Sequence, residues 1–167
     1  KYPAEWDTEP YRAQNRYLPH PRPRAAYAAM ISELDDHVGK VLAALDQAGV
    51  TQRTLVIFTS DNGTTHEGYT DSRIQVGGAD ARFFRSTADL RGYKGSVYEG
   101  GIRVPMIAKL PDRITAGTVN DSPSYFADWF PTLCDVAGFD KPAGLDGDSL
   151  WPVLTGQQKS FTTRKPM

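Results

Sequence analysis

The segment Leu55-Val56-Ile57-Phe58-Thr59-Ser60-Asp61-Asn62-Gly63 decides the fold class. Its first half is a short apolar run with β-branched residues, which is typical of a strand buried on both faces. Its second half changes at once to hydroxyl, carboxylate and amide side chains. Open α/β folds carry their sites at the carboxyl ends of such strands, so the segment predicts an α/β domain with a polar site at this strand end.

Two residues of this segment suit a hard metal ion. Asp61 and Asn62 offer oxygen donors without nitrogen or sulfur, which fits Ca²⁺ or Mg²⁺ better than Zn²⁺. Asn-Gly is also a strong turn signal, and an Asp-Asn-Gly turn without a metal explains the same residues. The segment alone leaves both interpretations open.

The flanks of the strand extend the α/β pattern. Residues 25–48 place apolar side chains at steps of three and four and predict an amphipathic helix that Gly49 ends. Helix, short loop and strand are half of a βαβ crossover. Residues 1–24 are rich in proline and predict an extended arm that packs its aromatic side chains along a surface.

After Gly63 we expect a loop of about thirty residues, a length that favours substrate contacts over a plain connection. The loop contains His66 and leads into a glycine-rich segment, residues 90–101. Glycines let backbones approach closely, and Lys94, between two of them, is placed to present a positive charge to an anion. A glycine-flanked lysine in an ordinary turn is the alternative. Residues 102–110 predict a second strand whose regular part follows Pro105.

The later part of the chain predicts further helices. Ser122-Pro123 reads as a helix start and Gly138 as its end, with Pro131 expected to kink or break the helix between them. Cys134 fits a packed core residue. Ser149 fits the cap of a short helix that runs to Leu154. The predicted domain therefore covers residues 25–156, between the arm and an irregular tail, residues 157–167.

Composition limits the function classes. The chain has 167 residues, of which 40% are hydrophobic and 23% charged, as expected for one globular core. A formal net charge of -1 implies no general attraction to nucleic acid or to a membrane, and no apolar run is long enough to span a bilayer. The chain opens without an initiator Met or an apolar signal region, so we expect it to begin inside a longer protein.

Several stretches together resemble the sulfatase family of the alkaline-phosphatase-like superfamily. The resemblance covers roughly residues 23–156, in the family's order and spacing; its stretches are residues 27–35, 59–63, 90–95, 98–105, 130–133 and 145–150. It implies part of an alkaline-phosphatase-like sandwich, with a mostly parallel central sheet flanked by helices. It also implies a periplasmic or secreted enzyme that hydrolyses the sulfate ester of a sugar or aryl compound.

The resemblance implies a role for each candidate residue. The positions matching Asp61 and Asn62 hold Ca²⁺, which polarises the ester. The position matching Lys94 contacts the sulfate and stabilises charge as the ester bond breaks. A histidine after the Asp-Asn-Gly turn often reaches the substrate, and His66 is the candidate. The family's nucleophile is a formylglycine made from the first residue of a Cys/Ser-x-Pro/Ala-x-Arg motif.

The chain departs from the family pattern in two ways. Cys134 is followed by Asp-Val-Ala, so no formylglycine motif is present, and the paired aspartates that complete the family's calcium site are absent. We therefore expect the later part of a sulfatase catalytic domain, inactive without the N-terminal half of the same enzyme. Two other classes remain: a phosphatase or phosphonate hydrolase of the superfamily, and a non-catalytic fragment that binds a complementary chain. Two-metal phosphatases place histidine beside the strand-end aspartate, whereas Asn62 favours calcium and sulfate.

Overall fold

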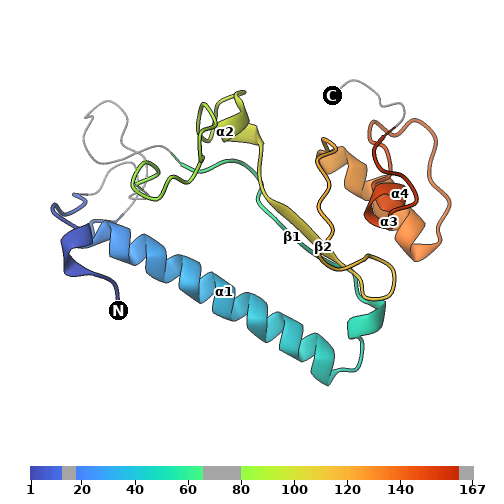
Figure 1. Cartoon of the computed structure of the whole chain (residues 1–167), viewed down its shortest axis with the longest axis horizontal. Helices are drawn as coiled ribbons and strands as arrows, with labels where there is room; N and C mark the ends of the chain where they lie inside the picture. The colour runs from blue at the N-terminus through green and yellow to red at the C-terminus, as the bar shows by residue number, and fades with distance from the viewer. Residues whose placement is uncertain (13–17, 66–79, 162–167) are drawn as a thin grey trace. The chain divides into compact units, whose positions relative to one another are not determined.

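The computed structural model describes residues 1–12, 18–65 and 80–161. The chain divides into two compact units, residues 1–48 with 58–107 and residues 49–57 with 108–167. The described elements, drawn in Figure 1, are η1 (Ala4–Trp6), α1 (Pro23–Gln47), η2 (Thr51–Arg53), β1 (Val56–Thr59), α2 (Glu99–Ile102), β2 (Met106–Lys109), η3 (Phe126–Asp128), α3 (Trp129–Ala137) and α4 (Trp151–Leu154).

Strands β1 and β2 pair in a two-stranded sheet, side by side in Figure 1. The Thr59 hydroxyl donates to the Pro105 carbonyl (3.0 Å), and the Gly63 N–H donates to the Gly101 carbonyl (2.9 Å). Because these partners meet in opposite order along the chain, the two segments run antiparallel. The α/β class is confirmed, and the second strand begins after Pro105 as predicted. Its predicted first residue is wrong, because Ile102 ends the helical turn α2.

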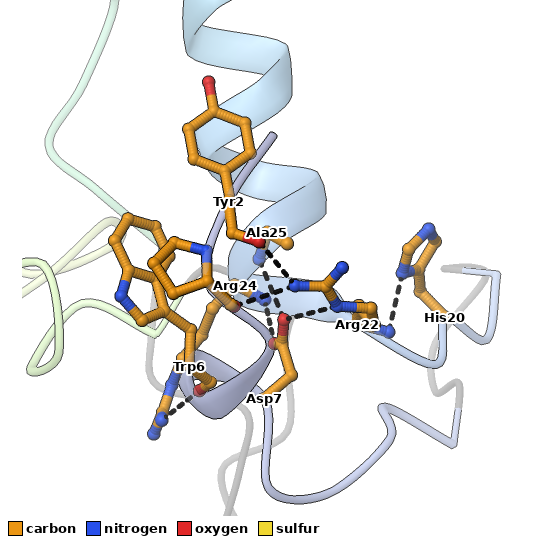
Figure 2. A network of polar contacts seen from close by, with 8 residues as sticks. Tyr2, Trp6, Asp7, His20, Arg22, Arg24 and Ala25 are labelled. Atoms are coloured by element: carbon orange, nitrogen blue, oxygen red, sulfur yellow. Dashed lines mark hydrogen bonds and ion pairs between the residues drawn. The ribbon is translucent and has the colours of Figure 1, made fainter.

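Helix α1 begins at Pro23, two residues before the predicted start, with proline at its first position. A carboxylate from the arm caps it: Asp7 accepts hydrogen bonds from the N–H groups of Arg24 (2.7 Å) and Ala25 (3.2 Å), as Figure 2 shows. The helix ends before Gly49, whose φ of +64° is the left-handed conformation predicted there. Within the described part of the chain, no helix is long and apolar enough to cross a membrane.

The apolar face of α1 is largely exposed. Its buried residues are Pro23 and Ala25, near the N-terminus. The predicted core-facing side chains keep large exposed fractions, namely Met30 (62%), Ile31 (48%), Leu34 (46%) and Val41 (57%). A contiguous apolar face of this kind marks a surface that another segment covers.

An aromatic cluster fixes the arm against the start of α1. Trp6 packs edge-on against Phe83 (5.4 Å between ring centroids) and Phe84 (6.0 Å), and Phe84 also contacts Tyr27 (5.1 Å). The Arg22 guanidinium donates to the carbonyl of Tyr2 (3.0 Å), a bond drawn in Figure 2. The arm therefore packs through aromatic side chains, as its composition predicted.

The start of the later helix differs from the prediction. The helical segment begins with η3, which Tyr125 precedes in place of Ser122, and continues directly into α3. The Asp128 carboxylate accepts the Tyr125 N–H (2.9 Å). Pro131 neither kinks nor breaks the helix, because it lies in the first turn of α3, where a missing N–H costs little. The predicted end is confirmed, since Gly138 has a φ of +73°.

Two fully buried polar residues organise the second unit. Asp128 and Thr132 are each 0% exposed. Asp128 also accepts the Asp148 N–H (3.0 Å), and the Thr132 hydroxyl donates to the Asp128 carbonyl (2.6 Å) while accepting the Leu150 N–H (2.7 Å). These bonds attach the segment before α4 to α3. Cys134 is buried beside them, as predicted for a core residue.

Replacing Asp128 with Asn should destabilise the protein by about 1–3 kcal/mol, because each carboxylate oxygen accepts one backbone N–H and an amide offers a single oxygen. Urea unfolding of the full-length protein measures this. The exposed Asp140→Asn is the matched control and should change the free energy of unfolding by less than about 0.5 kcal/mol. Equal stabilities for the two variants would contradict the role given to Asp128.

Candidate metal and substrate site

Residues 60–63, which we name the ligand turn, follow β1 directly. The Ser60 hydroxyl donates to the Asn62 carbonyl (2.9 Å) and tightens the turn. Asp61 is exposed and Asn62 half-buried, so both oxygen-bearing side chains lie at the strand end that the sequence predicted.

Residues 93–96, which we name the lysine turn, present Lys94. The Ser96 N–H donates to the Tyr93 carbonyl (2.9 Å), and Gly95 has a φ of +88°. Only glycine adopts this conformation without strain, which explains the glycine after Lys94. The Lys94 side chain is exposed.

A backbone hydrogen bond brings the two turns together. The Lys94 N–H donates to the Thr64 carbonyl (2.7 Å), and Thr64 is the residue directly after the ligand turn. The backbone of Lys94 therefore lies beside the segment that carries Asp61 and Asn62, in the same compact unit. His66 lies outside the described residues, so its predicted substrate contact stays a prediction.

Two arginines near the lysine turn make contacts within their own segment. Arg103 lies 3.3 Å from the Glu99 carboxylate, one helical turn away. The Arg91 guanidinium lies over the Tyr98 ring, 3.8 Å from its centroid, as a cation–π contact. These contacts support the shape of the loop around α2.

The donor atoms of Asp61 and Asn62 fit part of a calcium site. Ca²⁺ takes 6–8 oxygen ligands, and the ligand turn supplies a carboxylate and an amide. Within residues 1–12, 18–65 and 80–161, no group of three or more His, Cys, Asp or Glu residues lies together as a metal site. A calcium ion held by this turn would therefore need further oxygen ligands besides Asp61 and Asn62.

Asp80 forms an ion pair with Arg24, at the start of α1. Asp80 is 6% exposed, and one of its oxygens accepts hydrogen bonds from Arg24 Nε (2.9 Å) and Nη2 (2.6 Å). Its other oxygen accepts the Phe83 N–H (3.0 Å). Sequence reasoning missed this pair, since 56 residues separate its members and no local pattern links them.

The α/β fold therefore places oxygen donors at the end of a strand and a lysine on the adjoining turn. The protein-family model for Sulfatase matches residues 1–139. The chain belongs to the sulfatase family.

Known relatives agree with this assignment. The chain is 39% identical over 133 residues to steryl-sulfatase of Mus musculus, a match that covers 78% of this chain and 20% of that protein. It resembles the solved structure of Ps i-CgsB in complex with k-i-k-neocarrahexaose (TM-score 0.65, 30% identity, 88% of this chain and 28% of that one). It also resembles a structure in complex with its substrate D-glucosamine-2-N,6-O-disulfate (TM-score 0.62, 26% identity, 83% and 24%). The matched part of the chain therefore spans between 20% and 28% of the length of these relatives.

Asp80→Asn should destabilise the protein by about 1.5–3 kcal/mol, because it removes the charged acceptor of two arginine hydrogen bonds. Asp89→Asn is the control, since Asp89 pairs with Arg85 in an exposed ion pair (3.4 Å) of little energetic value. Thermal unfolding of both variants measures the difference. Similar melting temperatures would show that the Arg24–Asp80 pair does not anchor this segment.

Proposed function

We propose that the protein containing this chain is a calcium-dependent sulfatase that hydrolyses the sulfate monoester of a sugar or aryl compound. Family membership supports the reaction type. The observation that carries the proposal is the Lys94–Thr64 hydrogen bond (2.7 Å), because it places a cationic residue on the turn next to the oxygen donors. A disulfated glucosamine as the substrate in one structural relative supports a sulfated sugar. Family resemblance favours a periplasmic or secreted enzyme.

The charges of the side chains suggest the roles of Asp61, Asn62 and Lys94. Asp61 and Asn62 would hold Ca²⁺, which when bound polarises the sulfate ester. Sulfate esters are weakly basic anions, so the enzyme gains most from fixed positive charge that interacts more strongly with the departing group in the transition state. Lys94 supplies such a charge from the adjoining turn.

The nucleophile comes from outside this chain. Cys134 is buried and is followed by Asp-Val-Ala, so it neither faces a site nor fits the modification motif. By family resemblance the nucleophile is a formylglycine in the N-terminal half of the enzyme. The isolated chain should hydrolyse no sulfate ester and should bind calcium weakly or not at all by calorimetry.

The exposed face of α1 supports a packing partner from the same enzyme. Met30, Ile31, Leu34 and Val41 present an apolar surface along the helix. The relatives are roughly three to four times as long as this chain, which leaves enough protein to cover it. We therefore assign this face to the remainder of the catalytic domain. A phosphatase or phosphonate hydrolase fits less well, because Asn62 stands where two-metal enzymes place histidine.

Asp61→Ala in the full-length enzyme should lower kcat at least about 100-fold, since it removes a carboxylate from the ion that stabilises transition-state charge. Excess calcium should restore activity only in part. Asp121→Ala, at an exposed residue elsewhere in the chain, is the control and should keep wild-type activity. Full activity of Asp61→Ala would refute the ligand assignment.

Lys94→Ala in the full-length enzyme should lower kcat for aryl sulfate hydrolysis by roughly 10²–10³, the usual loss for one electrostatic stabiliser. Lys109→Ala, which removes an exposed lysine at the end of β2, is the matched control for net charge. Circular dichroism should show the same fold for both variants. An unchanged kcat for Lys94→Ala would exclude its catalytic role.

A further inference from the structure

We propose that Gly63, Gly100 and Gly101 are positioning residues of the reaction, and that α2 is a backbone spacer that sets the separation of the ligand turn from the lysine turn. The inference rests on the proposed roles of Asp61, Asn62 and Lys94. It assigns a task to glycines, which carry no functional side chain.

One side of the spacer contacts the ligand turn. A Cβ atom added to Gly63 would lie 2.0 Å from the Gly100 carbonyl oxygen and 2.9 Å from Gly101 Cα. Both are backbone atoms, so no flexible side chain can move aside. The Gly63 N–H donates to the Gly101 carbonyl (2.9 Å), which holds the two backbones at this distance.

The other side of the spacer contacts the lysine turn and the residues before it. A Cβ on Gly101 would lie 2.2 Å from the Ser96 carbonyl oxygen and 2.5 Å from that of Tyr93. A Cβ on Gly100 would lie 2.1 Å from the Gly92 carbonyl oxygen. The helical turn α2 is therefore packed through bare backbone against both functional turns.

Space, and not backbone conformation, requires these glycines. None of Gly63, Gly100 and Gly101 has the positive φ that would itself demand glycine, whereas Gly92 (+92°) and Gly95 (+88°) do. Alanine is thus compatible with the local backbone at all three positions. The added Cβ atom would instead separate α2 from the turns packed against it.

The displacement caused by an added Cβ atom is large enough to change the rate of catalysis. Real Cβ atoms essentially never approach another atom closer than 3.0 Å, so alanine at Gly63 displaces the ligand turn from α2 by at least about 1 Å. A misplacement of about 1 Å can cost about 100-fold in rate. Gly63→Ala should therefore separate the calcium ligands from Lys94 without removing any functional group.

The test is a double-mutant cycle in the full-length enzyme with an aryl sulfate, in which kcat is measured at saturating calcium and the calcium requirement in a separate titration. Gly63→Ala should lower kcat about 100-fold and raise the calcium concentration needed for half activity. In that background Lys94→Ala should cost less than about tenfold, against roughly 10²–10³ in the wild-type enzyme, because Lys94 has already lost its position. Gly101→Ala should behave in the same way.

Gly144→Ala controls for stability alone. Gly144 has a φ of +80°, so alanine there is strained, yet among the described residues no atom lies within 4 Å of an added Cβ. Its melting temperature should fall while kcat stays at the wild-type value. If Gly63→Ala likewise changes only the melting temperature, or if its loss multiplies with that of Lys94→Ala, the spacer role is wrong. A fully active Lys94→Ala enzyme would overturn the proposed function itself and the inference with it.

If the alanine variants do not fold, hydrogen exchange on the unsubstituted full-length enzyme tests whether the contact at α2 holds the two turns together. The N–H groups of Gly63 and Lys94 bridge the segments that the spacer holds together (2.9 and 2.7 Å). They should exchange slowly and with similar protection. Rapid exchange of either one would show that the turns are not held by this contact.

Discussion

The ligand turn and α2 approach so closely that a single Cβ atom does not fit between Gly63 and Gly100. This constraint fixes the rest of the site. It lets the Gly63 N–H reach the Gly101 carbonyl and the Lys94 N–H reach the Thr64 carbonyl, so two turns some thirty residues apart in sequence become neighbours. Because the contact is between backbones, it depends little on the identity of the neighbouring side chains.

The two compact units hold their segments together through different contacts. In the first, the arm caps α1 through Asp7 and packs Trp6 against Phe83, while Arg24 pairs with Asp80. In the second, the buried carboxylate of Asp128 gathers backbone N–H groups from two segments. The apolar face of α1 has no comparable cover within the described residues, which agrees with a chain whose matched part spans between 20% and 28% of the length of the relatives described above.

Local chemistry made much of this fold predictable. Periodicity located α1, Gly49 and Gly138 marked helix ends, and Pro105 marked the start of β2. The errors arose where a local signal competed with a distant contact. Ser122-Pro123 resembles a helix start, but the buried Asp128 sets the true one. The cap of α1 comes from Asp7, 17 residues before Arg24, a spacing no capping motif has. The glycines around Lys94 predict a close approach of backbones, but only the folded structure shows which backbones approach.

In the proposed function, Asp61, Asn62 and Lys94 act on one sulfate group from two adjoining turns. The most direct measurement is a crystal structure of the full-length protein grown with calcium and a non-hydrolysable sulfate ester analogue, with the ion located by anomalous scattering. We expect a calcium ion bound by Asp61 and Asn62, with the Lys94 ammonium within hydrogen-bonding distance of a sulfate oxygen. A calcium ion held elsewhere, or a sulfate group bound out of reach of Lys94, would contradict it.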